Sequence, residues 1–175
     1  MEKTILVTYA SKYGATREIA EKIGEGLSLA GLGVDVLPVT SVRQVDQYRA
    51  VIMGSAIYIG KWQKDAEVFL KENEARLAKR PVWLFSSGPS GEGNPLDLVD
   101  GALLPSNLKP IVERIKQKEV TIFHGNIDLG KINGMEKFAV KNVVKKPFGD
   151  YRDWNMIKNW TNPIAASLKD NQALN

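Results

Sequence analysis

Residues 4–20 read TILVTYASKYGATREIA, an apolar, β-branched run followed by a short polar loop and the start of an amphipathic pattern. The run over Lys3–Tyr9 predicts a buried strand. From Thr16 to Ala30, apolar residues recur at spacings of four, four and three, which predicts a helix with Thr16 as its N-cap. A buried strand that enters a helix through one short loop is typical of the first unit of a parallel α/β sheet.

The rest of the chain repeats this alternation of strands and helices. Further strands are predicted at Val34–Val39, Ala50–Ser55, Pro81–Ser86 and Glu119–His124. Helices are predicted at Lys64–Leu77, at Asn107–Lys116 and from Asp153 onward, the last with a kink or break at Pro163. The pattern predicts an α/β, three-layer, doubly wound fold with a five-stranded parallel sheet in the order 2-1-3-4-5. No repeat or linker interrupts it, so residues 1–175 are interpreted as one domain with an insertion at about 126–152.

The composition narrows the chemistry that the side chains can supply. The chain has no cysteine and one histidine, His124, which excludes disulfides, thiolate nucleophiles, iron–sulfur clusters and His-rich metal sites. Redox chemistry would therefore require a bound cofactor, and we predict no metal site and no catalytic side chain. His124 is interpreted as structural, with a role in the site as the alternative. No apolar run is long enough for a spanning helix and no signal peptide is evident, so a cytoplasmic location is expected.

In a doubly wound sheet the ligand lies beyond the carboxyl ends of the strands, where the strand order reverses. The loop after the first strand leads into a helix, and backbone N–H groups at a helix N-terminus bind anions. A phosphate fits this loop, although an ordinary strand–helix turn remains the alternative. Neither a Walker A motif nor GxGxxG is present. The predicted phosphate-binding residues are Ser11, Lys12, Tyr13, Gly14, Ala15 and Thr16.

Two more loops are expected at the same edge of the sheet. The loop after the third strand is apolar and aromatic, as a wall for a flat ring system requires. Tyr58 and Trp62 are the candidates for stacking, with Trp62 covering the next helix as the alternative. The loop after the fourth strand is rich in Gly and Ser and suits the polar edge of a heterocycle, or else a solvated connection. The predicted ring-binding residues are Ala56, Ile57, Tyr58, Ile59, Gly60, Ser87, Gly88 and Pro89.

The segments TYASKYGAT, VIMGSAIYIGKW and SSGPSG resemble the flavodoxin family. The chain is most similar to the flavodoxin-domain group that contains menaquinone-dependent protoporphyrinogen oxidase, through YASKYGATREIA, GSAIYIGKW, FHGNIDLGKI and DYRDWNMIKNW. The resemblance implies that FMN is the cofactor, with its phosphate in the first loop and its isoalloxazine ring between the other two. The chain departs from simple electron-carrier flavodoxins in two respects. It is basic, with a net charge of +4, and its third loop lacks an aromatic residue to cover the ring.

These features predict an FMN-dependent oxidoreductase that moves electrons between a small organic substrate, or a redox partner protein, and a quinone-type acceptor. A flavodoxin-type carrier without its own substrate is one alternative. A non-redox phosphate-binding module that has lost its flavin is another. A receiver-type signalling domain is disfavoured because Tyr9 and Ala10, not an acidic pair, end the first strand. Nucleic acid is not expected, since the lysines form no stripe interleaved with aromatic residues.

The insertion contains a basic segment, residues 131–146, which could form an amphipathic helix. Its apolar stripe consists of Ile132, Met135, Phe138, Ala139 and Val143. One interpretation is a helix packed beside the sheet with a solvated basic face. The other is peripheral contact with an anionic membrane or a partner protein. Resemblance to the oxidase group supports the second, because the corresponding insertion there is linked to membrane and substrate contact.

Overall fold

The computed structural model describes residues 4–128, 130–139 and 148–173. Five strands form the central parallel sheet, in the order β2-β1-β3-β5-β6. They are β1 (Ile5–Ala10), β2 (Val34–Pro38), β3 (Ala50–Tyr58), β5 (Val82–Ser87) and β6 (Glu119–Phe123). This arrangement confirms the predicted fold and the 2-1-3-4-5 order of the main strands. Pro38 ends an edge strand, where its missing N–H costs no ladder hydrogen bond.

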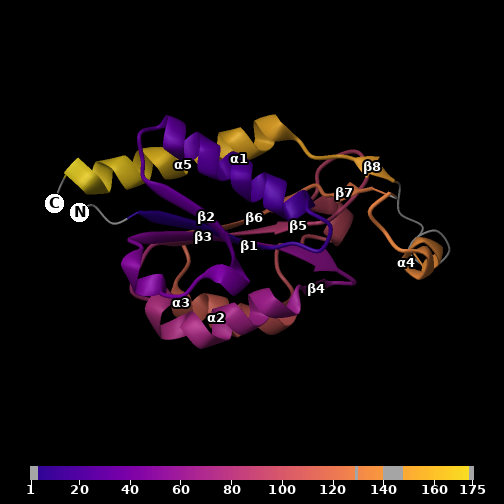
Figure 1. The fold of residues 1–175 in the computed structure, drawn as a ribbon, viewed down its shortest axis with the longest axis horizontal. Helices are drawn as coiled ribbons and strands as arrows, with labels where there is room; N and C mark the ends of the chain where they lie inside the picture. Colours follow the sequence, from indigo (N-terminus) through magenta and orange to yellow (C-terminus); the bar gives the residue numbers. More distant parts are fainter. Residues whose placement is uncertain (1–3, 129, 140–147, 174–175) are drawn as a thin grey trace.

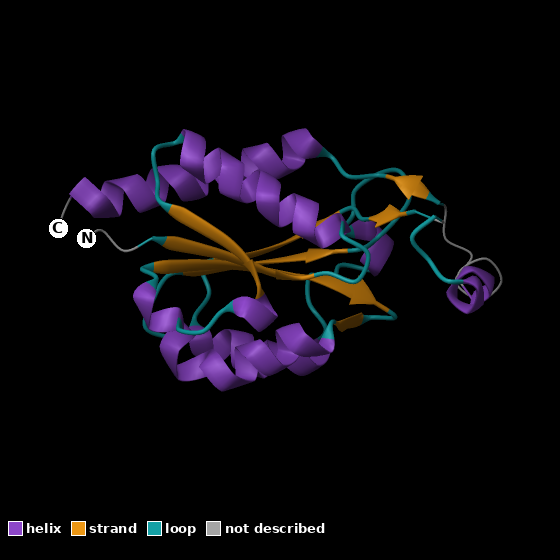
Figure 2. Ribbon diagram, in the orientation of Figure 1, coloured by secondary structure: helices purple, strands orange, loops and turns teal. Residues whose placement is uncertain are grey.

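Helices cover both faces of the sheet (Figure 1). One face carries α1 (Ala15–Leu29) and α5 (Trp154–Ala173), and the other carries α2 (Lys64–Leu77) and α3 (Lys109–Ile115). Figure 2 shows the resulting three layers. Because successive side chains of a strand point to opposite faces, the core divides in two. Ile5, Val7 and Phe85 pack toward α1 and α5, whereas Leu6, Val51 and Leu84 pack toward α2 and α3.

Two glycines let α1 approach its neighbours closely. A Cβ at Gly24 would lie 2.4 Å from a methyl group of Val36 in β2, and one at Gly26 would lie 3.1 Å from a methyl group of Thr161 in α5. Gly24 therefore allows close packing of the helix on the sheet, whereas Gly26 accommodates a second helix. This close packing fixes the position of the α1 N-terminus relative to the sheet.

The start of α1 differs from the prediction. The helix begins at Ala15 with Gly14 as its N-cap, a residue without a side chain that could cap it. Thr16 therefore lies inside the first turn, and its prediction as the N-cap was wrong. Gly14 adopts a left-handed conformation (φ 96°), which is readily available to glycine and turns the chain into the helix before Thr16.

The last helix is continuous through Pro163, so the break allowed for at that residue was wrong. The missing backbone N–H of Pro163 deprives only the carbonyl of Asn159, and both residues are solvent-exposed, where water can serve that carbonyl. On the opposite side of the helix, Ile157, Trp160 and Ile164 are buried against the sheet. Packing of residues before and after the proline keeps the helix continuous.

Shorter elements complete the structure. The antiparallel strand β4 (Lys61–Trp62) pairs with the end of β3, and β7 (Asn126–Ile127) pairs with β8 (Gly149–Asp150). Single 3₁₀ turns lie at Val39–Ser41, Val45–Gln47, Asp97–Val99 and Ser106–Leu108. The predicted loop after the third strand is thus partly strand and closes as a hairpin, because Ile59 and Gly60 both adopt positive φ and make a two-residue turn.

The described part of the insertion contains β7, β8 and the short helix α4 (Gly134–Ala139), which lies apart from the helical layers (Figure 1). Met135 and Phe138 are 86% and 69% exposed, whereas Ile132 is buried. The predicted stripe is therefore not packed beside the sheet at these two positions. The rest of the predicted helix, residues 140–146, lies outside the described residues, as does Lys3 at the start of the first predicted strand. None of the helices in the described part of the chain is long and apolar enough to cross a bilayer.

Candidate functional site

A cavity of about 260 Å³ opens at the carboxyl ends of β1, β3 and β5. It lies between the strands where the sheet order reverses, which is where doubly wound folds bind ligands. A larger hollow of about 610 Å³ lies between the 3₁₀ turns after β2 and one side of α2, with a mostly polar lining. The smaller cavity is the better ligand site, because apolar and aromatic side chains line it together with a few convergent polar groups.

The cavity brings together the three predicted loops. Every predicted cofactor-binding residue except Gly14 lines it: Ser11, Lys12, Tyr13, Ala15, Thr16, Ala56, Ile57, Tyr58, Ile59, Gly60, Ser87, Gly88 and Pro89. The lining also contains residues that sequence reasoning missed: Gln63, Val99, Gly125, Asn126, Ile127 and Ile132. Gly125 to Ile127 directly follow the fifth strand, so the rule that located the other loops could have found them. Val99 and Ile132 come from distant loops and carry no sequence signal.

The first loop and the start of α1 form an anion-binding arrangement. The N–H of Gly14 donates to Ser11 Oγ at 3.0 Å, which fixes the loop. The first N–H groups of a helix have no acceptor within the helix, and no side chain caps α1. The helix N-terminus also carries the positive end of the helix dipole. Gly14 lies outside the cavity lining but sets the direction in which these N–H groups point.

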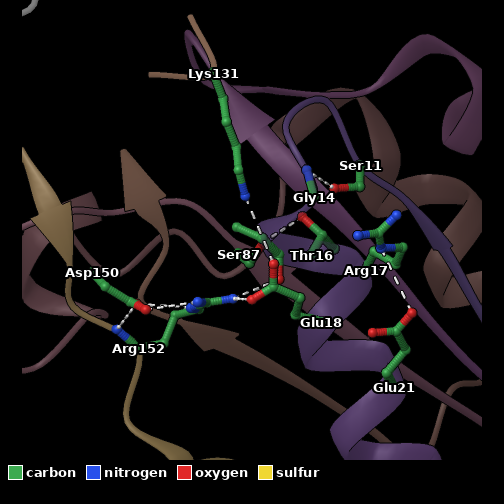
Figure 3. Close-up of polar contacts among 11 residues, drawn as sticks. Ser11, Gly14, Thr16, Arg17, Glu18, Glu21, Ser87, Lys131, Asp150 and Arg152 are labelled. Atoms are coloured by element: carbon green, nitrogen blue, oxygen red, sulfur yellow. Dashed lines mark hydrogen bonds and ion pairs between the residues drawn. The ribbon is translucent and has the colours of Figure 1, made fainter. Parts of the chain in front are cut away.

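A buried pair of hydroxyl groups joins the first loop to the third. Thr16 Oγ1 and Ser87 Oγ are 2.8 Å apart, and both residues are 1% exposed. The pair links the first turn of α1 to the end of β5 across the floor of the cavity (Figure 3). Removing only one of two hydrogen-bonded buried hydroxyls is costly, because the other then has no hydrogen-bond partner, neither protein nor water. The two loops therefore hold a fixed relative position.

The hairpin of β3 and β4 provides the apolar wall. Ile59 at its tip is 80% exposed with φ 51°, a left-handed conformation that is strained for a β-branched residue. The Lys12 ammonium lies 4.2 Å from the centroid of the Tyr58 ring and 5.1 Å from that of Tyr13. Tyr58 is therefore at the cavity with one ring face against a cation.

Trp62 lies in the core between the sheet and α2, not in the cavity lining. The residue is 3% exposed, and its indole N–H donates to Ser86 Oγ at 2.9 Å. The prediction of Trp62 as a stacking residue was wrong, and the alternative, that it covers the following helix, is confirmed. Trp62 pairs with Ile57 across the hairpin, and both side chains pack against the core cluster on the α2 side of the sheet.

The third loop is held by close backbone approach and by His124. A Cβ at Gly88 would lie 2.8 Å from the carbonyl oxygen of Ile57, so this position tolerates only glycine without movement. The ring nitrogens of His124 lie 3.2 Å and 2.9 Å from the carbonyl oxygens of Pro89 and Gly93. His124 is buried and absent from the cavity lining, which agrees with its structural interpretation. It anchors the loop that borders the cavity.

A network of charged side chains joins the insertion to the first turn of α1 (Figure 3). Arg152 forms a two-pronged ion pair with Asp150, at 2.8 Å and 2.6 Å, and its Nη1 is 2.6 Å from Oε2 of Glu18. Lys131 Nζ approaches the other oxygen of Glu18 at 3.9 Å. The hydrogen bonds from Arg152 hold the pKa of Asp150 below its usual value. Sequence reasoning missed this network, since its members lie far apart in the chain.

Comparison with known proteins identifies the family. The profile of the flavodoxin domain matches residues 6–153. The chain belongs to the flavodoxin-domain family. This is a family of flavin-binding redox proteins.

The flavodoxin domain is similar in sequence to the protoporphyrinogen IX dehydrogenase [quinone] of Escherichia coli K12, at 23% identity over 91% of this chain and 93% of that protein. It is also similar to diflavin flavoprotein A 1 of Synechocystis, at 26% identity over 67% of this chain and 21% of that protein. Among solved structures, a flavodoxin from the domain Archaea matches 95% of this chain and 99% of its own, with a TM-score of 0.63 and 16% identity. The rubredoxin:oxygen oxidoreductase of Desulfovibrio gigas matches 98% of this chain and 37% of its own, with a TM-score of 0.64 and 16% identity.

Proposed function

We propose that this flavodoxin domain binds FMN and acts as an oxidoreductase, passing electrons between a small organic substrate or redox partner and a quinone-type acceptor. The observation that carries the proposal is the cavity at the sheet edge. One end of it is an uncapped helix N-terminus, and the other is an apolar and aromatic hairpin. This pairing matches a ligand that has an anionic group at one end and a flat, largely apolar ring at the other.

The residues present fit FMN at both ends. At the phosphate end, Gly14 lacks a Cβ and the N–H groups of the first helical turn are available to an anion. At the ring end, Ala56 to Gly60 form one wall, while Ser87, Gly88 and Pro89 border the other side. FMN would supply the redox chemistry, accepting and donating electrons through its ring system. The residues of the chain would bind the phosphate, orient the ring and limit access of water to it.

Two observations favour a reaction on a small substrate over pure electron transport. One relative is named protoporphyrinogen IX dehydrogenase [quinone], and its alignment covers 91% of this chain and 93% of that protein. The chain also carries a net charge of +4, which favours anionic substrates through its long-range field. We therefore propose protoporphyrinogen IX and a quinone as the first substrate and acceptor to test.

The cofactor is tested by the visible spectrum of the purified protein, before and after adding FMN and removing the excess. We expect flavin absorption to remain with the protein and FMN fluorescence to change on binding. The variant Gly88→Ala should retain less flavin than the wild type, because its Cβ would collide with the Ile57 carbonyl and narrow the site. A wild-type protein that retains no flavin would refute the redox function and favour the non-redox phosphate-binding module.

The reaction is tested with the FMN-loaded protein, protoporphyrinogen IX and a soluble quinone, followed by the fluorescence of the porphyrin product. Turnover that requires both FMN and quinone supports the oxidase. A loaded protein that exchanges electrons with redox proteins but leaves protoporphyrinogen IX unchanged would instead identify an electron carrier.

We further propose that the basic segment 131–146 contacts an anionic membrane surface, where a lipophilic quinone would be available. Within the described part of this segment, Met135 and Phe138 expose apolar side chains, and Lys131 and Lys137 lie close to them in sequence. Apolar residues next to lysines are typical of peripheral membrane contact. We expect the protein to sediment with vesicles that contain anionic lipid, and less so at high salt. Equal binding of the Met135→Ser/Phe138→Ser variant, or no binding of the wild type to these vesicles, would refute this proposal.

A further inference from the structure

The guanidinium of Arg152 is buried beside the candidate phosphate loop. Arg152 is not among the residues that line the cavity. Its side chain is 5% exposed. It follows β8 at the end of the insertion, and no sequence motif marks it. A buried cation requires compensation, and here two carboxylates provide it: Asp150, its near neighbour in the chain, and Glu18, from the first turn of α1.

Glu18 is the unusual member of this network, because its carboxylate lies next to the turn that leads into α1. Its Oε1 lies 3.9 Å from the position that a Cβ of Gly14 would occupy, within the turn that leads into α1. An unpaired carboxylate at this place would repel a phosphate group bound by the first helical turn. Arg152 and Lys131 approach the two oxygens of Glu18 from the insertion, as Figure 3 shows.

Other cations near the loop are less able to offset this charge. Arg17 places its Nη2 3.8 Å from the same Gly14 position, but its side chain is 53% exposed and pairs with Glu21. Exposed charges are screened by water and salt, whereas buried ones are screened much less. Lys12 lies over the rings of Tyr13 and Tyr58. Arg152 is thus the buried cation in direct contact with Glu18 among the described residues.

We infer that Arg152 is a specificity-determining positioning residue: by neutralising Glu18 it sets the preference of the site for phosphorylated over unphosphorylated flavin. This inference rests on the proposed function, in which the first loop binds the phosphate of FMN. Arg152 acts through Glu18 and is not itself assigned to the cofactor. Arg152 and Lys131 both belong to the insertion. Through their contacts with Glu18, the insertion thereby contributes to cofactor selection.

The test compares the dissociation constants of FMN and riboflavin, which differ only in the phosphate. Replacing one buried charge near a phosphate is expected to weaken FMN binding about tenfold in Arg152→Gln, with riboflavin changing by less than about twofold. Glu18→Gln should strengthen FMN binding about threefold, and the double variant should return to within about threefold of the wild type. Arg114→Gln, which breaks an exposed pair with Glu74 on the far face of the sheet, is the control and should change neither constant.

The outcomes separate a charge effect from a structural one. Equal loss of both flavins in Arg152→Gln, or an unchanged FMN-to-riboflavin ratio in all variants, would overturn the inference while leaving the proposed function standing. If Arg152→Gln does not fold, Glu18→Gln decides, because it keeps the pair between Arg152 and Asp150. A wild-type protein that holds neither flavin would overturn both proposals, and one that holds FMN without preference over riboflavin would overturn this inference alone.

Discussion

The hydroxyl pair of Thr16 and Ser87 should contribute to stability as a coupled unit. In Ser87→Ala, the buried Oγ1 of Thr16 loses the partner that lies 2.8 Å away, and the 1% exposure of both residues keeps water from replacing it. Leaving one buried hydroxyl unpaired costs about 1–3 kcal/mol. Thr16→Val, which keeps the shape of the side chain, should cost a similar amount by orphaning Ser87.

The assay is urea unfolding of the flavin-free protein, followed by far-ultraviolet circular dichroism. With a denaturant slope of about 2 kcal/mol per M, a loss of about 2 kcal/mol lowers the midpoint by about 1 M. The double variant Thr16→Val/Ser87→Ala should lose less than the sum of the single variants, because it leaves no orphaned partner. Coupling between contacting residues is usually about 0.5–3 kcal/mol.

Ser90→Ala is a matched control in the same loop. Ser90 is also buried, but its Oγ has no hydrogen-bond partner among the described residues, so its removal should be neutral or stabilising. Additive losses in the double variant, to within about 0.5 kcal/mol, would refute the reasoning, since they would show that the two hydroxyls do not share a bond.

Three further predictions concern packing, the last helix and acid stability. Gly88→Ala should lose about 1–3 kcal/mol in urea unfolding and bind FMN more weakly, because its Cβ would lie 2.8 Å from the Ile57 carbonyl; wild-type stability would contradict this. Pro163→Ala should raise the Tm, since an alanine restores the missing helical hydrogen bond at an exposed position, and an unchanged or lower Tm would argue against it. The pKa of Asp150, measured by NMR, should lie below its usual value and rise in Arg152→Gln. A carboxyl with a lowered folded-state pKa stabilises the fold above its unfolded value and loses that contribution on acidification, so the stability difference between wild type and Arg152→Gln should narrow below about pH 4. A difference that stays constant through that range would be evidence against the pairing.

Much of the site was predictable because the parallel sheet places the ends of β1, β3 and β5 at one edge. Once the strands were assigned, Ser11, Tyr58 and Gly88 had to meet there, and all three line the cavity. Trp62 was misplaced because a two-residue turn at Ile59 and Gly60 continues the strand as a hairpin. An isoleucine with positive φ is uncommon, so the conformational preference of Ile59 does not predict that turn.

Local pattern determined the strands, the helices and the parallel sheet, since apolar periodicity depends only on neighbours within a few residues along the chain. Tertiary structure alone decided the contacts between distant segments. The continuity of α5 through Pro163 and the network of Arg152 with Glu18 are of this kind. Each depends on which groups come into contact, or stay in water, when the elements pack. The free energies of burial and charge pairing therefore exist only once the chain has folded.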